Sequence, residues 1–200
     1  MKQLILIVTI ALLAATAPAQ EKVSSEEVHR IAGRLLEQHS QTKNAQVKVD
    51  ADANKAAGFK GGDGGVLLIL DKKLSAELLE KATAEIVPVG QLWMLKIVPA
   101  NDGKATPNNK LRILTVGPDD KQVKLPLFLL GARKKAEQLE LVIFGKDKEP
   151  LILIPLTKSE SAGDGAVDVS GEKRGEGSGE LTFKLLGKYQ AKLMVTQQAD

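Results

Sequence analysis

A chain of 200 residues without cysteine can build one sizeable core, but it must do so without disulfides or thiolate metal ligands. Its 28 basic and 25 acidic side chains nearly balance, which excludes the strongly basic surface of a typical nucleic-acid-binding protein. Aromatic residues make up only 3% of the chain, too few for base-stacking platforms, so we do not expect nucleic acid as a partner.

The first 19 residues have the layout of a secretory signal peptide. Lys2 precedes an apolar run over residues 4–15, which is shorter than the about 20 apolar residues of a membrane span. Two A-x-A exits follow, and the earlier one would leave Pro18 directly after the cut, where proline hinders a protease. We therefore expect cleavage between Ala19 and Gln20. The mature chain would be exported, periplasmic or extracellular, with no membrane span.

Residues 20–45 predict an amphipathic helix followed by a polar linker. Ser24 and Glu27 have the spacing of a capping box. Apolar residues then recur at helical spacing through about residue 39, namely Val28, Ile31, Ala32, Leu35 and Leu36. We expect this stripe to pack on the rest of the protein; docking to a partner is the alternative.

Residues 46–200 predict a β-rich domain. Alternating apolar residues indicate a strand over 46–53, and the glycines after it let the chain turn into a buried strand over 66–70. A short helix is expected over 74–82, with Ser75 as its N-cap. Five more strand candidates are 89–98, 111–116, 123–130, 139–144 and 151–156, and the last 40 residues add 167–169, 181–186 and 189–196.

Charged turns over 132–137 and 146–149 separate several of these strands, which is the spacing of antiparallel hairpins. Pro126 and Pro155 lack an N–H group and therefore mark edge positions or bulges. The predicted fold is mainly β (α+β): an antiparallel β-sandwich of immunoglobulin-like style, with an N-terminal helix and one further short helix.

Asp50, Asp52 and Asn54 match the first three oxygen donors of a calcium-binding EF-hand loop. The sixth position requires glycine and carries Lys55, and the twelfth requires glutamate and carries Gly61. The glycines that follow lead into a strand, whereas a phosphate loop leads into a helix. We therefore predict neither a metal site nor a phosphate or cofactor site here.

Catalytic patterns are equally incomplete. His29 and His39 lie roughly 80° apart around the predicted helix, so they do not share one tight face. Two S-x-x-K matches, at 40–43 and 170–173, lack the companion motifs of serine acyltransferases. Two carboxylate pairs, Glu137 with Glu140 and Asp147 with Glu149, are most simply interpreted as charged hairpin ends. No catalytic residue is predicted.

The expected function is that of an exported, non-catalytic binding or structural module of the cell envelope or extracellular space. Its partner would be an unknown protein or envelope component, bound through sheet edges or hairpin loops. Trp93, apolar on both sides in sequence, is expected in the core rather than on a ligand platform. The alternatives are a secreted hydrolase that uses Asp and Glu residues, and a periplasmic carrier of an apolar ligand.

Overall fold

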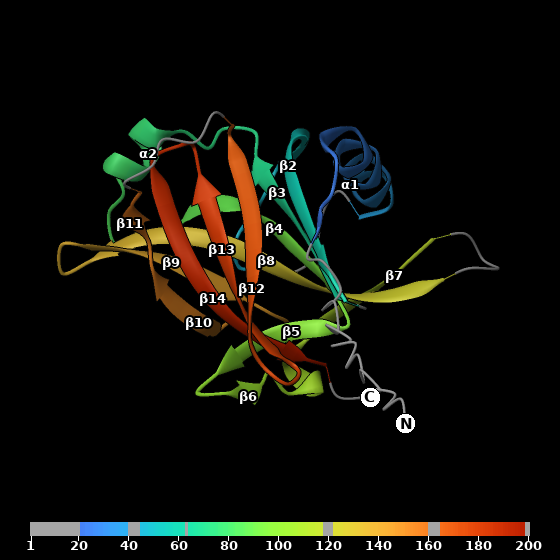
Figure 1. Cartoon of the computed structure of the whole chain (residues 1–200). Helices are drawn as coiled ribbons and strands as arrows, with labels where there is room; N and C mark the ends of the chain where they lie inside the picture. The colour runs from blue at the N-terminus through green and yellow to red at the C-terminus, as the bar shows by residue number, and fades with distance from the viewer. Residues whose placement is uncertain (1–20, 40–44, 63, 118–121, 160–164, 199–200) are drawn as a thin grey trace, which may run out of the picture.

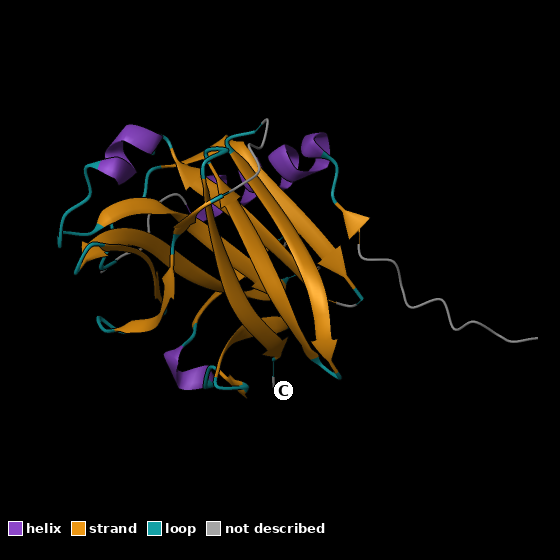
Figure 2. Cartoon of the chain, turned by 60° about the vertical axis from the view of Figure 1, so that its left-hand side comes forward, coloured by secondary structure: helices purple, strands orange, loops and turns teal. Residues whose placement is uncertain are grey.

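The computed structural model describes residues 21–39, 45–62, 64–117, 122–159 and 165–198. The predicted signal peptide and its cleavage site lie outside the described residues, as do residues 40–44 of the polar linker expected after the N-terminal helix. Two antiparallel sheets face each other, with the helices at their periphery (Figures 1 and 2). The prediction of a mainly β sandwich with two α-helices is confirmed; its immunoglobulin-like style is not.

Sheet A has eight strands in the order β1-β2-β3-β4-β8-β9-β10, with β7 pairing beside β8. Its strands are β1 (Glu21–Lys22), β2 (Ala51–Gly61), β3 (Gly64–Asp71), β4 (Val87–Leu95), β7 (Arg112–Val116), β8 (Val123–Lys135), β9 (Gln138–Phe144) and β10 (Pro150–Pro155). Most neighbours in this sheet are also neighbours in sequence, so most of the sheet is built from successive hairpins.

Sheet B has six strands in the order β12-β13-β14-β5-β6, with β11 pairing beside β14. Its strands are β5 (Ile97–Asn101), β6 (Lys104–Ala105), β11 (Thr157–Lys158), β12 (Val167–Gly175), β13 (Ser178–Leu185) and β14 (Tyr189–Gln197). A short 3-10 helix, η1 (Asn108–Lys110), leads from β6 towards sheet A.

The central strands of sheet A are buried on both faces, which explains their continuous apolar runs. Leu68 points to the core between the two sheets, whereas its neighbour Ile69 points to the outer face. Helix α1 (Ser25–His39) covers that outer face with Val28, Ala32 and Leu35, as its apolar stripe predicted.

Both helices begin where the sequence indicated. The Glu27 N–H lies 3.4 Å from the Ser24 hydroxyl oxygen, the first half of a capping box. Helix α2 (Ala76–Glu80) is capped by Ser75, whose hydroxyl accepts a hydrogen bond from the Leu78 N–H. No helix among the described residues is long and apolar enough to cross a membrane.

The strand predicted over 46–53 has the wrong bounds, because β2 begins only at Ala51. Val47 and Val49 are nevertheless buried, as their alternation predicted, since they pack on the outer face of sheet A. The backbone just before β2 is held by two hydrogen bonds: the Asp50 N–H donates to the Asp71 carboxylate at 2.7 Å, and the Asp50 carbonyl accepts from the Lys72 N–H at 2.8 Å.

The single strand predicted over 89–98 is wrong. The chain leaves sheet A after Leu95 and enters sheet B at Ile97, so it forms two strands, β4 and β5. Lys96 makes the corner with a left-handed φ of 58°. The corner contains neither glycine nor proline, the residues that usually signal a break between strands. The apolar residues on its two sides therefore read as one strand in the sequence.

The charged turn predicted over 132–137 is mostly strand, so this prediction is also wrong. Strand β8 continues to Lys135 and pairs with β9 up to Gln138, and only Ala136 and Glu137 form the turn, with φ of 46° and 67°. Charged side chains on this stretch can reach solvent from an extended backbone, so their charge did not require a loop.

Candidate binding surface

The carboxylates in and around the acidic stretch before the first glycines are each held by a nearby cation or a backbone N–H group. Asp50 forms an ion pair with Lys72 at 3.0 Å, which raises the pKa of that lysine through a hydrogen bond to its charged form. The Asp52 carboxylate accepts from the Asn54 N–H at 3.0 Å. Asp71, missed in the sequence, is buried and accepts from two backbone N–H groups, those of Asp50 and Lys73.

Within the described ranges, no cluster of three or more histidine or carboxylate side chains is arranged to hold a metal ion. The ring centroid of His39 lies 6.1 Å from that of Trp93, and the His39 Nε2 lies 3.1 Å from the Thr115 carbonyl oxygen. His39 therefore joins α1 to β7. The S-x-x-K match at 40–43 lies outside the described residues, and the match at 170–173 lies along β12.

The four carboxylates of the hairpin ends lie in different settings. Glu137 pairs with Lys134 at 2.6 Å, and this hydrogen bond lowers the pKa of the glutamate. Glu140 pairs with Arg133 at 3.1 Å across the β8–β9 hairpin. Asp147 and Glu149 are exposed in the loop that leads to β10.

Trp93 lies in the core as predicted and is 2% exposed. Its indole N–H donates to the side-chain oxygen of Gln91 at 3.1 Å. Gln91, 1% exposed, is thus a buried polar residue whose role is to satisfy the tryptophan.

The feature that stands out is the edge formed by strand β10. Within the described part of the chain, β10 pairs on one side only, with β9, and therefore ends sheet A. Its sequence is Pro-Leu-Ile-Leu-Ile-Pro, with four consecutive apolar residues between two prolines. Leu153 is 42% exposed, and the other three apolar side chains are only partly buried. An apolar strand edge of this kind is a template for another strand.

The side chains of β10 divide between the two faces of sheet A. Ile152 lies opposite Ile143 and Ile154 opposite Leu141, so both isoleucines share the inner face with the core between the sheets. Leu153 lies opposite Val142, which belongs to the outer face. A strand added beyond β10 would therefore find apolar side chains on both of its faces.

The main-chain groups of β10 alternate in the same way. The Leu156 N–H, just after the strand, donates to the Leu139 carbonyl at 2.9 Å. Hydrogen-bonded and open pairs alternate in an antiparallel ladder, so Ile154 and Ile152 also direct their N–H and C=O groups towards β9. Leu153 directs both groups outwards. Pro155 presents only its carbonyl outwards, since it has no N–H.

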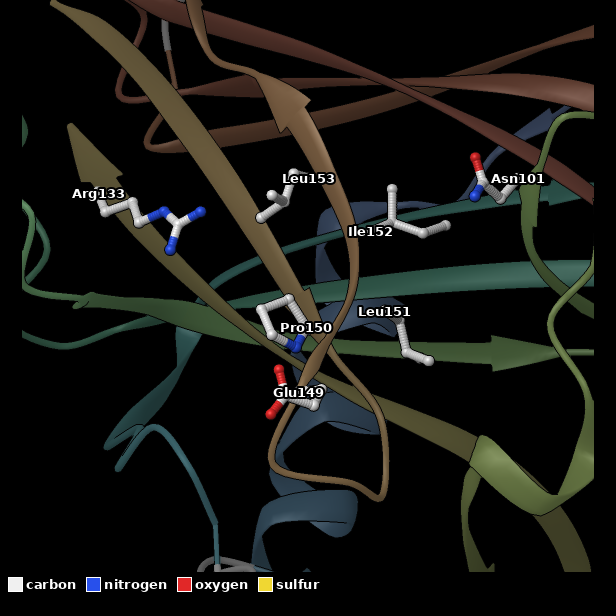
Figure 3. A pocket seen from close by; sticks show the side chains of 7 residues that line it. All are labelled: Asn101, Arg133, Glu149, Pro150, Leu151, Ile152 and Leu153. Carbon is white, nitrogen blue, oxygen red and sulfur yellow. The ribbon is translucent and has the colours of Figure 1, made fainter. Parts of the chain in front are cut away.

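This edge lies in an open depression of about 530 Å³ lined by Asn101, Arg133 and residues 149–153. Figure 3 shows Leu153 and Arg133 on one side of the β10 ribbon, with Ile152 and Asn101 on the other. Walls from β8 and the end of β5 thus flank the edge. Arg133 is 24% and its partner Glu140 18% exposed, so this ion pair is mostly shielded from solvent.

The sequence contains one signal for this surface, Pro155, which was predicted to mark an edge position or a bulge and lies in the edge strand. It gave no signal that β10 would be the last strand of its sheet, because that depends on where the chain goes after Leu156. The comparisons with known proteins found no match among protein-family models, curated proteins or solved structures.

Proposed function

We propose that the protein is an exported, non-catalytic binding module that captures an extended segment of a partner protein along the free edge of β10. The observation that carries this proposal is an apolar edge strand whose outward N–H and C=O groups lie in an open depression. Export rests on the signal peptide predicted from the sequence, which places the partner in the envelope or outside the cell.

Strand addition fits this surface because it uses both the main-chain N–H and C=O groups and the apolar side chains that β10 exposes. Main-chain hydrogen bonds supply part of the affinity, and pockets for alternate side chains supply specificity. Leu153 is 42% exposed, so covering its remaining surface favours binding by roughly 0.6–1.3 kcal/mol, the same fraction of the roughly 1.5–3 kcal/mol for a fully exposed leucine. The proposal of a non-catalytic role rests on the sequence, in which no complete catalytic motif occurs.

Panning a random-peptide display library on the mature protein would test the proposal. Peptides enriched on the wild type should not bind Leu153→Lys, which places a charge on the edge. They should still bind Met194→Lys, a matched control because Met194 is 39% exposed on the face of β14 opposite the core residues Leu193 and Val195. Peptides that bind both variants equally, or no enrichment at all, would contradict the proposal.

Hydrogen exchange gives a second readout that needs no variant. In the free protein the Leu153 amide should exchange fast, whereas the amides of Ile152 and Ile154 should be protected by β9. Bound peptide should slow exchange at Leu153. Unchanged exchange at that amide in a saturated complex would show that the peptide binds elsewhere.

A further inference from the structure

The structure also indicates what kind of segment this edge accepts, an inference that rests on the proposed function. We infer that the partner segment is short and uncharged, with β-branched apolar side chains facing Ile152 and Ile154. Three features of the edge carry this inference: its two prolines, its apolar inner face, and the ion pair on its outer face.

The prolines limit the length of the segment. Pro150 and Pro155 cannot donate, and the register of β10 shifts between Pro150 and Ile152. Between them, Leu153 presents the one complete outward pair of N–H and C=O groups in regular register, and Pro155 adds a carbonyl. The N–H and C=O groups of a partner strand point towards β10 only at every second residue. Hydrogen bonds at Leu153 and Pro155 therefore hold a partner strand over about five residues.

The inner face of the edge selects apolar side chains. Ile152 and Ile154 pack against the core cluster between the two sheets, yet each keeps some exposed surface. A partner residue on this face would lie beside both isoleucines. β-branched residues fit such a pleated, half-buried surface best.

The outer face disfavours a charge of either sign. Arg133 and Glu140 already neutralise each other at 3.1 Å beside Leu153. A charge placed near them meets one like and one opposite charge, so it loses hydration without a net attraction. Glu149 is exposed at the rim, where attraction to a cation is weak and screened by salt. Binding should therefore depend on apolar content and hardly on ionic strength.

The two prolines of β10 favour a single segment over a second copy of this chain. A second copy that paired through its own β10 would bring Pro150 and Pro155, which have no N–H groups, so it would offer this edge fewer donors than a segment without proline. A second copy remains a distinct outcome that sedimentation of the protein alone can detect.

The test uses capped synthetic peptides and the mature protein, with affinity measured by isothermal titration calorimetry. The first probe, acetyl-Ser-Val-Thr-Val-Thr-Val-Ser-amide, should bind wild type and the Met194→Lys control, but not Leu153→Lys. Replacing its valines by serine should weaken binding at least about tenfold, because each apolar contact is lost. Replacing its threonines by lysine should not tighten binding. Raising salt from about 50 to 500 mM should change Kd less than about threefold.

The outcomes separate this inference from the proposed function. Peptides with lysine or glutamate that bind wild type more tightly, and still fail to bind Leu153→Lys, would refute the inference that the segment is uncharged. The proposal of strand capture at β10 would then stand. A dimer of the wild type that Leu153→Lys dissolves would make a second copy the partner and overturn the segment. Absence of binding by every peptide, including library-derived ones, would overturn both.

Discussion

Replacing Gly90 by alanine should destabilise the protein far more than the size of one methyl group suggests. Gly90 lies in β4 between β3 and β8, where an added Cβ would be 2.3 Å from the Ile69 carbonyl oxygen and 3.1 Å from the Leu70 Cα. Both are backbone atoms, so no change of rotamer relieves the contact. The strands must separate instead, although each is packed on both faces.

The size of this effect follows from the rigidity of the site. Overpacking a core typically costs 1–3 kcal/mol, and because backbone must move here we expect about 3 kcal/mol. For a domain of this length, 1 kcal/mol shifts Tm by roughly 2–4 °C, so Gly90→Ala should lower Tm by roughly 6–12 °C. Gly33→Ala is the matched control, because an added Cβ on helix α1 meets no atom within 4 Å. It should raise stability by about 0.5–1 kcal/mol, since alanine favours helix.

Thermal unfolding followed by far-ultraviolet circular dichroism would measure both variants. Denaturation with guanidinium can be followed in parallel by fluorescence of Trp93, the single tryptophan, which is buried in the native state. If Gly90→Ala melted within about 2 °C of the wild type, the close approach of β3 to β4 would be wrong, and with it the packing of sheet A.

Three further predictions test other parts of the structure. Gln91→Ala should cost about 1–3 kcal/mol in guanidinium unfolding, because it leaves the Trp93 indole N–H buried without an acceptor; a neutral effect would refute that hydrogen bond. Hydrogen bonds from Arg174 and Lys192 lower the pKa of Glu180 in the folded protein. The ionised carboxylate therefore stabilises the fold fully at pH values above its unfolded pKa of about 4.3, and this stabilisation is lost as the pH falls through the lower folded pKa. The stability gap between wild type and Glu180→Gln should thus be constant from about pH 7 to 5 and shrink below about pH 4; a gap unchanged at pH 3 would contradict the ion pairs. Finally, Ile154→Pro should cost about 3 kcal/mol or more by removing an N–H directed to β9, whereas Leu153→Pro should cost less than about 1 kcal/mol; equal losses would refute the alternation of β10.

Sequence patterns predicted the elements whose signals are local. Ser24 and Ser75 cap the helices because their hydroxyls lie beside free N–H groups whatever the rest of the chain does. The missed corner at Lys96 depends on a distant event, the pairing of Ile97 with Gln197 one hundred residues later in the chain. That pairing, together with the hydrogen bond from the Gln198 N–H to the Lys96 carbonyl, helps to hold the left-handed lysine, so the residue types around the corner do not predict it.

The candidate surface was hidden for a similar reason. The sequence of β10 reads as a buried strand, since apolar residues on both faces usually mean neighbours on both sides. Its exposure arises because the chain after Leu156 enters sheet B as β11 and pairs with β14. Edge status is therefore a property of the topology, and only Pro155 reflected it in the sequence.

Another strand that ends a sheet, β12, differs from β10 in composition, and this difference supports a function for β10. Strand β12 ends sheet B, and it carries the consecutive charges Glu172, Lys173 and Arg174, the usual protection against unwanted strand pairing. Strand β10 is protected only at its ends, by Pro150 and Pro155, while its centre stays apolar. Lysine at position 153 would point to the outer face and would protect the edge without touching the core. Since leucine at this position gains nothing in solubility, retaining an apolar centre between two prolines fits the proposed capture of a partner segment of limited length.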